Sequence, residues 1–145
     1  LSEAGLPCIA DPGSKIVEYA HNFQIDVVPF VGPSSIILAL MASGMNGQNF
    51  AFTGYLPIDK SDRTRALRNL ESLTKKTGQT QIFMETPYRN HQLFDTIIKV
   101  CSNNTKLCIA SDITLPSENI KTKTIAEWKQ EKININKKPA IFLIN

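Results

Sequence analysis

The sequence predicts an α/β protein made of the end of an N-terminal α/β domain, residues 1–47, and a complete C-terminal α+β domain, residues 48–145. Two patterns support this fold class. Short runs of β-branched and aromatic residues alternate with segments whose apolar residues recur at helical spacing, as in successive strand–helix units. The small and polar stretch at residues 43–49 then interrupts the alternation and is typical of a linker between domains.

The composition is that of an ordinary globular protein, with 42% hydrophobic and 20% charged residues in a chain of 145. The formal net charge of +3 permits contact with a polyanion without requiring it. The three cysteines have no paired spacing and no zinc-like Cys/His pattern, so we expect reduced thiols, no metal site and a cytoplasmic protein. The longest apolar run, residues 36–42, is too short to span a bilayer, so we expect no membrane partner. Because the chain opens with Leu1, and residues 1–5 are typical of a strand's end entering a loop, we expect it to begin inside a larger protein.

The sequence of residues 1–47 predicts a long turn, a helix, a strand and a second helix. Asp11 is expected to cap the first helix, with Pro12 at its first position and an end near Asn22. The run over residues 27–31 predicts a buried strand. Gly32 then turns the chain into an apolar helix that starts at Pro33. Two strand–helix units in succession favour parallel pairing with right-handed crossovers.

The junction between this strand and this helix is the first candidate site. Ser34 and Ser35 place hydroxyls and free backbone N–H groups beyond the end of the strand, where ligands bind in open α/β sheets. The same residues are equally typical of a helix start in a packed α/β unit.

The second part predicts a mixed sheet of five strands, at residues 50–55, 81–84, 107–110, 121–124 and 140–144. Three helices lie between them. The first carries a leucine stripe over residues 66–73 and a cationic outer face. The second starts at Thr86 and Pro87 and runs to Cys101, and the third spans residues 126–131. The residues expected on the cationic face are Arg63, Arg65, Arg68, Lys75 and Lys76.

A second candidate site lies where a strand passes into the helix that follows it. Glu85, Tyr88 and Arg89 place a carboxylate, a phenol and a guanidinium within one turn, where they could hold a substrate or pair with one another. Six lysines between Asn119 and Lys138 add a basic bias that weakly favours phosphate contact.

Five motifs together resemble the tetrapyrrole-methylase superfamily of S-adenosylmethionine-dependent methyltransferases, and within it the branch that methylates a ribose 2′-hydroxyl of small-subunit ribosomal RNA. They occur in the family's order over nearly the whole chain. The motifs are SEAGLP at residues 2–7, ADPG at 10–13, VGPSS at 31–35, GYLP at 54–57 and ETPYR at 85–89.

The resemblance implies two α/β domains, a methyl donor bound in the cleft between them, and a homodimer. By this likeness the donor would contact a loop, a helix start and three strand ends, namely Leu6, Ile9, Ser34, Ser35, Ile36, Met84, Ala110 and Ala140. These positions are neutral, as a cationic sulfonium requires.

The resemblance also implies roles for charged residues. A ribose hydroxyl loses its proton as it attacks, so a carboxylate base is expected, with Glu85 the first candidate and Asp112 the second. Arg89 would hold a phosphate of the RNA, with Tyr88 beside it and Arg63 as an outer contact.

Three departures from the family pattern leave other substrates open. The family's opening strand and Gly-rich loop are absent, Ser111-Asp112 stands where the ribosomal branch carries Arg-Glu, and Lys138-Pro139-Ala140 replaces a Lys-Gly-Glu element. One alternative is a methyltransferase for a corrin or porphyrin ring. Another is an inactive folding or dimerisation module. RNA is favoured over the ring by four arginines, Arg63, Arg65, Arg68 and Arg89.

Overall fold

A computed structural model describes residues 5–145, and the chain divides into two compact units, the first ending at Ser35 and the second spanning Ile36–Asn145. We describe each unit by itself. Four of the five residues of the strand end expected at residues 1–5, and the first three residues of the SEAGLP motif, lie outside the described residues.

The first unit contains one helix, α1 (Ser14–Asn22), among its described residues. The residue before the helix is Gly13, and no side chain caps it, so the cap predicted at Asp11 is wrong. The strand predicted over residues 27–31 is also wrong, since the segment is irregular and its side chains are exposed. A β-branched run becomes a strand only when another strand pairs with it, and none of the five strands of the sheet does so here.

The second unit opens with α2 (Ser35–Ser43), which begins two residues after the predicted Pro33. Ile36, Ala39 and Leu40 are buried in a core cluster on one face of the sheet. The Thr122 hydroxyl donates to the Ser43 carbonyl at 2.7 Å, fixing the end of the helix to the sheet. Because α2 packs in this way, the compact unit starts at Ile36, and the domain boundary expected between residues 47 and 48 stays a prediction.

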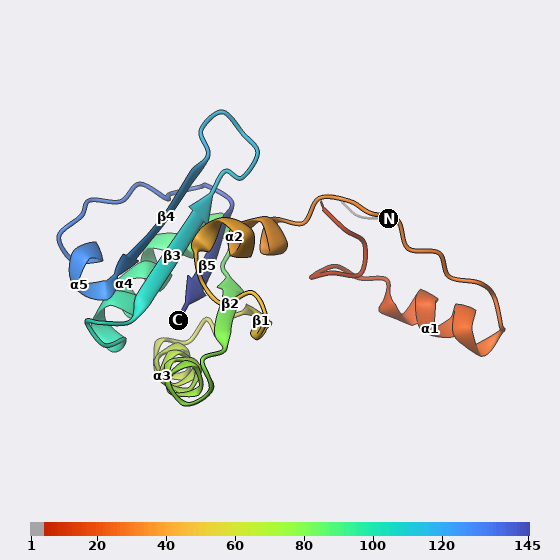
Figure 1. The fold of residues 1–145 in the computed structure, drawn as a ribbon, viewed down its shortest axis with the longest axis horizontal. Helices are drawn as coiled ribbons and strands as arrows, with labels where there is room; N and C mark the ends of the chain where they lie inside the picture. The colour runs from red at the N-terminus through yellow and green to blue at the C-terminus, as the bar shows by residue number, and fades with distance from the viewer. Residues whose placement is uncertain (1–4) are drawn as a thin grey trace. The chain divides into compact units, whose positions relative to one another are not determined.

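The mixed five-stranded sheet predicted for the second part is confirmed. Its strands are β1 (Phe50–Tyr55), β2 (Thr80–Met84), β3 (Lys106–Ser111), β4 (Asn119–Thr124) and β5 (Ala140–Ile144). The order across the sheet is β1-β2-β5-β3-β4 (Figure 1). Only β1 and β2 pair in parallel, while β5 lies antiparallel to both of its neighbours. Gly54 adopts φ 72° where the register of β1 shifts, a conformation that side-chain-bearing residues rarely adopt.

Alternation along the strands divides the core between two faces. Phe83, Ile109 and Phe142 belong to the cluster beneath the later helices, and the rings of Phe83 and Phe142 stack with centroids 6.1 Å apart. Cys108 and Leu143, which point the other way, belong to the cluster that holds α2. The sheet therefore lies between α2 and a layer of three helices (Figure 1).

The three predicted helices of this layer are present as α3 (Lys60–Thr77), α4 (Asn90–Val100) and α5 (Ile125–Trp128). Asp59 caps α3, and Gly78 ends it at φ 69°. The expected start at Thr86 and Pro87 is a short 3-10 turn, Pro87–Arg89, and the Thr86 side chain makes no capping hydrogen bond. The third helix is shorter than predicted.

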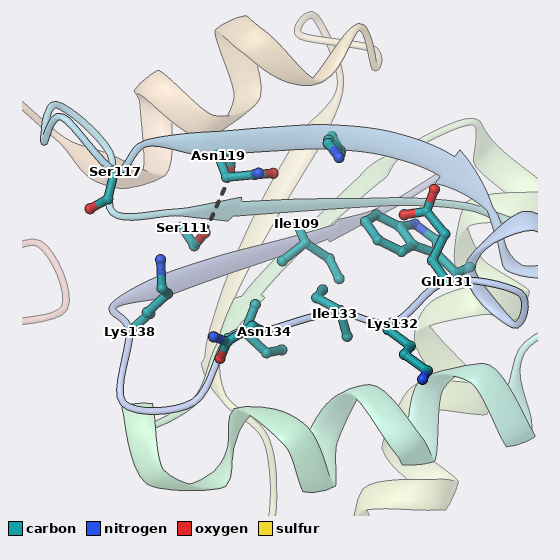
Figure 2. A pocket seen from close by; sticks show the side chains of 12 residues that line it. Ile109, Ser111, Ser117, Asn119, Glu131, Lys132, Ile133, Asn134 and Lys138 are labelled. Atoms are coloured by element: carbon teal, nitrogen blue, oxygen red, sulfur yellow. Dashed lines mark hydrogen bonds between the residues drawn. The ribbon is translucent and has the colours of Figure 1, made fainter.

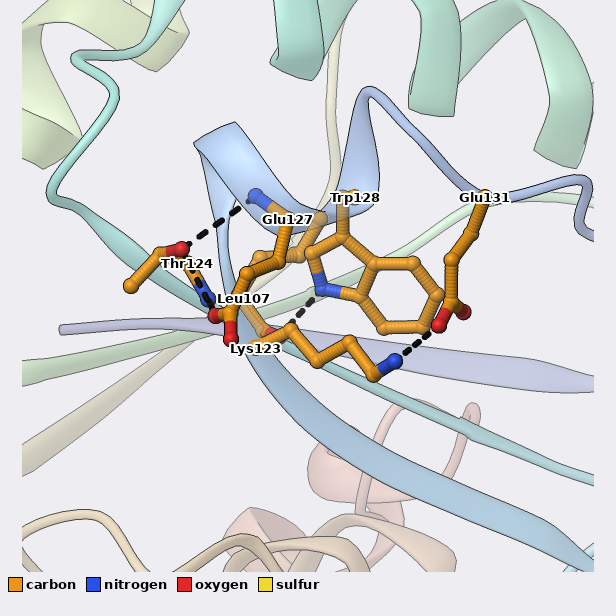
Figure 3. Close-up of polar contacts among 6 residues, drawn as sticks. All are labelled: Leu107, Lys123, Thr124, Glu127, Trp128 and Glu131. Atoms are coloured by element: carbon orange, nitrogen blue, oxygen red, sulfur yellow. Dashed lines mark hydrogen bonds and ion pairs between the residues drawn. The ribbon is translucent and has the colours of Figure 1, made fainter.

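A capping box accounts for the start of α5, which is only four residues long. The Thr124 hydroxyl accepts from the Glu127 backbone N–H, and the Glu127 carboxylate accepts from the Thr124 backbone N–H (Figure 3). The buried Trp128 then donates from its indole N–H to the Leu107 carbonyl at 2.8 Å. The bond from Trp128 joins α5 to β3.

Candidate functional site

The ends of three adjacent strands meet at one edge of the sheet. β2 and β3 finish there and β5 begins there, so Met84 pairs with Ile141 and Ile141 pairs with Ala110. Ala140 lies next along this edge, opposite Ser111. The structure thus brings together Met84, Ala110 and Ala140, which are far apart in the sequence.

The side chains at this edge point to two different faces. Met84, Ala110 and Ile141 belong to the cluster that holds α2, and Ile36 of α2 belongs to the same cluster. The Ala140 side chain belongs to the cluster on the opposite face, so Ala140 contributes only backbone atoms to this edge. The result is an apolar, uncharged corner formed by α2 and three strand ends.

The sequence did not identify Ile141 as a member of this corner. Its position follows from β5 inserting between β2 and β3, which sets the register with Met84 and Ala110. The continuous apolar run over residues 140–144 predicts a buried strand but not the strands beside it. The sequence therefore indicated a strand that contains Ile141, but not the contacts of Ile141 with the other strand ends.

Four other predicted donor contacts lie in the first unit. A Cβ added to Gly32 would come within 2.8 Å of the Leu6 side chain, and one added to Gly5 within 3.7 Å of the Pro33 carbonyl. The loop that contains Leu6 therefore lies against the segment that leads to Ser34 and Ser35. Ser34 is buried, whereas Ile9 and Ser35 are exposed. Their grouping with the sheet edge stays a prediction.

Glu85 follows Met84 directly and is held by two short hydrogen bonds. Its Oε1 accepts from the Thr86 backbone N–H at 2.7 Å and from the Arg89 guanidinium at 2.7 Å. The Glu85 side chain is 1% exposed and that of Arg89 is 29% exposed. Within residues 5–145 the buried Oε2 of Glu85 has no partner, and the same holds for Nε of Arg89. The pair thus stabilises the 3-10 turn and leaves one carboxylate oxygen unbonded.

Asp112 ties the end of β3 to the start of β5. Its Oδ2 accepts from Lys138 Nζ at 2.7 Å and from the Ser117 hydroxyl at 2.9 Å. Its backbone N–H donates to the Pro139 carbonyl at 3.0 Å. The bond from Lys138, and then the bond from Ser117, lower the pKa of the Asp112 carboxyl below its usual value. The resulting carboxylate is a weak base.

The predicted position of Arg63 on a solvent-facing surface is wrong. Arg63 is 5% exposed, and its guanidinium donates to the Thr96 hydroxyl at 3.1 Å and to the Ile58 carbonyl at 2.9 Å. Since Arg63 precedes Leu67 by four residues, it shares the buried stripe of α3 with that leucine. This spacing was the signal that could have placed it. Tyr88, in contrast, is exposed.

Within residues 5–145, no group of three His, Cys, Asp or Glu side chains is arranged to bind a metal ion. None of the helices in the described part combines the length and hydropathy that crossing a membrane would take.

Comparison with known proteins relates the chain to methyltransferases. The model of the family described as Tetrapyrrole (Corrin/Porphyrin) Methylases matches residues 1–129. A protein named "Ribosomal RNA small subunit methyltransferase I" from Vibrio cholerae is 31% identical over 148 residues, covering 100% of this chain and 50% of the relative. The protein of the same name from Buchnera aphidicola subsp. Schizaphis graminum is 35% identical, covering 99% of this chain and 50% of the relative. The chain spans about half the length of the relatives it matches.

Solved structures share the fold. The methyltransferase CobJ aligns with a TM-score of 0.61 at 13% identity, covering 97% of this chain and 61% of that protein. A conserved hypothetical protein from Aeropyrum pernix K1 aligns with a TM-score of 0.63 at 14% identity, covering 97% of this chain and 55% of that protein. At these identities the likeness concerns the fold alone.

Proposed function

Because this chain belongs to the tetrapyrrole (corrin/porphyrin) methylase family, we propose that it acts as an S-adenosylmethionine-dependent methyltransferase on a ribose 2′-hydroxyl of small-subunit ribosomal RNA. The observation that carries the proposal is the apolar corner where Met84, Ala110 and Ile141 meet Ile36 of α2. The names of the sequence relatives favour ribosomal RNA as the substrate.

The chemistry of this corner fits the proposed methyl donor. S-adenosylmethionine, when bound, supplies a methyl group on a positively charged sulfonium. The corner consists of apolar side chains and strand-end backbone, with no lysine or arginine in the cluster. Such walls exclude water and do not repel a cation. Met84, Ala110 and Ile36 would hold the donor here, together with backbone at Ala140 and, from the first unit, Leu6, Ile9, Ser34 and Ser35.

Glu85 is the preferred base for the hydroxyl proton. Its buried Oε2 has no hydrogen-bond partner among the described residues, whereas the bonds from Lys138 and Ser117 lower the pKa of the Asp112 carboxyl. The ribose oxygen would release its proton to Oε2 as it attacks. Arg89 and the Thr86 N–H would keep the carboxylate in place. Asp112 stays the second candidate.

Arg89 is the proposed contact for an RNA phosphate. Its guanidinium is partly exposed and uses one terminal nitrogen on Glu85, so the planar fork can still approach an anion. Tyr88, its exposed neighbour, would contact the same strand of RNA. Because Arg63 is bonded inside the protein, we do not assign it to the substrate.

Methyl transfer to isolated small ribosomal subunits tests the proposal. With isotope-labelled S-adenosylmethionine we expect label in the RNA, and none in a corrin or porphyrin acceptor assayed beside it. Label in the ring alone would favour the tetrapyrrole alternative. No binding of S-adenosylmethionine in a calorimetric titration would favour the inactive module.

Two variants and one control distinguish the role of Glu85 as a base from the role of Arg89 in binding RNA. Glu85→Gln should lower the rate of transfer by about 100-fold or more while donor affinity stays unchanged, because the base is lost and the shape is kept. Arg89→Ala should weaken RNA binding but not donor binding. Lys99→Ala, which removes an exposed cation from α4, is the matched control and should change neither.

We further propose a homodimer that works in the cytoplasm, where ribosomal subunits are methylated. Analytical ultracentrifugation of the chain measures its assembly state directly. A sedimentation mass equal to one chain at micromolar concentration would contradict the dimer.

A further inference from the structure

A small polar pocket lies on the face of the sheet opposite the apolar corner. It encloses about 140 Å³ between the β3–β4 hairpin and the loop that leads to β5. Ile109 and Ser111 line it from β3, while Ala110 between them belongs to the cluster on the other face. We call it the lysine pocket. It is lined by Ile109, Ser111, Ser117, Asn119, Lys121, Trp128, Glu131, Lys132, Ile133, Asn134, Ile135 and Lys138.

The charges around the lysine pocket do not cancel. Lys138 pairs with Asp112, and Glu131 pairs with Lys123, which lies outside the lining. Lys121 and Lys132 have no carboxylate within 4.0 Å in the part of the chain that the structure describes. The lining therefore offers two uncompensated positive charges, and a mobile anion can approach them.

Hydroxyl and amide groups line the pocket beside the lysines. Ser111 is 3% exposed, and its hydroxyl makes only a long bond of 3.4 Å to the Asn119 carbonyl. In Figure 2 the side chains of Ser111, Asn134 and Lys138 converge on the space between the hairpin and the loop. Hydroxyls, amides and ammonium groups are the donors that proteins use on phosphate oxygens.

The size of the lysine pocket selects among anions. Pockets for drug-sized ligands enclose about 300–1,000 Å³, so a volume near 140 Å³ is too small for a base with its sugar. It suits a single tetrahedral oxyanion with a few waters. Lysines also act on phosphate as point charges and do not read base identity.

We propose that the lysine pocket binds one phosphate of the RNA backbone, as an accessory contact on the face of the sheet opposite the methyl-transfer corner. This inference rests on the proposed RNA substrate. It adds a site that fixes the orientation of the RNA without reading its sequence.

The test combines two variants with a salt series on the full chain. Lys121→Gln with Lys132→Gln should weaken binding of a fluorescent single-stranded RNA about fivefold or more at ~0.1 M salt, because the site loses its uncompensated charges. The slope of log affinity against log salt should fall by about 0.7, the value for one lost phosphate contact on a single strand. Lys76→Gln with Lys99→Gln removes two exposed lysines outside the pocket and should leave both quantities unchanged.

NMR titrations identify the ligand. RNA should shift the backbone amides of Ser111 and Asn134, and the lysine variant should lose these shifts. Shifts produced by inorganic phosphate or by a polyglutamate peptide, but not by RNA, would overturn the inference. Equal RNA affinity in the variant and the wild type would also overturn it.

Methyl transfer distinguishes this inference from the proposed function. If the wild type methylates ribosomal subunits and the lysine variant binds RNA normally, the phosphate site in the lysine pocket is wrong and the enzyme proposal stands. If RNA shifts the pocket amides but no transfer occurs, the pocket stands and the enzyme proposal fails.

Discussion

At the scale of single residues, the charged groups of this protein mostly bond within the chain. Glu71 of α3 is the clearest case. Its Oε1 accepts from the Ser102 backbone N–H at 2.7 Å, from the Thr105 hydroxyl and from Lys75 at 3.2 Å. Burial opposes the charged form, but these bonds outweigh it and lower the pKa of the Glu71 carboxyl. Glu71 therefore anchors the turn between α4 and β3.

Replacing Glu71 with alanine should destabilise the protein by about 2–3 kcal/mol, because the donors of Ser102 and Thr105 would be left without their acceptor. Urea unfolding followed by tryptophan fluorescence measures the loss. Glu71→Gln keeps one acceptor oxygen and should cost less. Equal stability of Glu71→Ala and the wild type would contradict the anchoring role.

The same carboxylate gives stability a pH dependence with a definite sign. Since folding lowers the pKa of Glu71, its contribution is fully present above its ordinary value of 4.5 and is lost as the pH falls through the lower folded value. The unfolding midpoint of the wild type should drop in this acid range. Glu71→Gln should show a shallower drop, and identical pH profiles would count against the assignment.

The cysteines should differ in reactivity. Burial, followed by the nearby charge of Glu71, raises the pKa of the Cys101 thiol to about 12, and burial raises the pKa of the Cys108 thiol. Both thiols therefore stay protonated and inaccessible at about pH 8. Mass spectrometry after iodoacetamide treatment should find only the exposed Cys8 alkylated in the folded protein, and all three cysteines after denaturation. Modification of Cys101 at the rate of Cys8 would contradict the buried core.

At the scale of elements, α5 depends on its ends more than on its length. Four residues supply too few internal hydrogen bonds for a stable helix, so the capping box and the packing of Trp128 must hold it. Trp128 packs edge-on against Phe94, with ring centroids 6.0 Å apart. The Lys123 side chain runs beside the Trp128 ring (Figure 3), and its ammonium lies 5.9 Å from the ring centroid.

Thr124→Ala should therefore cost about 1 kcal/mol, the usual effect of removing a side-chain N-cap. Thr124→Ser keeps the hydroxyl and is the control. Thermal unfolding measures both, and Trp128, the single tryptophan of the chain, reports on the affected helix. A Thr124→Ala variant that melts with the wild type would show that packing alone holds α5.

The elements also show which kinds of structure the sequence could predict. Helices such as α3 and α4 follow from local spacing, so their existence was predicted, as was the end of α4 near Cys101. The failed strand at residues 27–31 has the correct composition, but strand formation depends on a partner elsewhere in the chain. The residues of the candidate site likewise divide into those that local sequence indicates and those that depend on distant strands. Glu85 and Arg89 were proposed because they lie within one turn directly after a strand, whereas Ile141 required the register between distant strands.

At the scale of the whole molecule, both core clusters are built from residues 36–144. A protein comprising residues 34–145 should therefore fold alone and unfold at the same urea concentration as the full chain. Trp128 fluorescence reports the transition in both. A midpoint lower by about 0.5 M urea, equivalent to about 1 kcal/mol, would show that the first unit contributes to stability.

The place of β5 between β2 and β3 has a consequence for how this protein is made. During translation the β1-β2 and β3-β4 pairs emerge first. One side of β2 and one side of β3 then lack a hydrogen-bonding partner until residues 140–144 leave the ribosome, and these are the two open edges. The nascent chain can form helices and hairpin early, but the central sheet closes only with its last strand. Until β5 is synthesised, those two open edges can pair with strands of other chains.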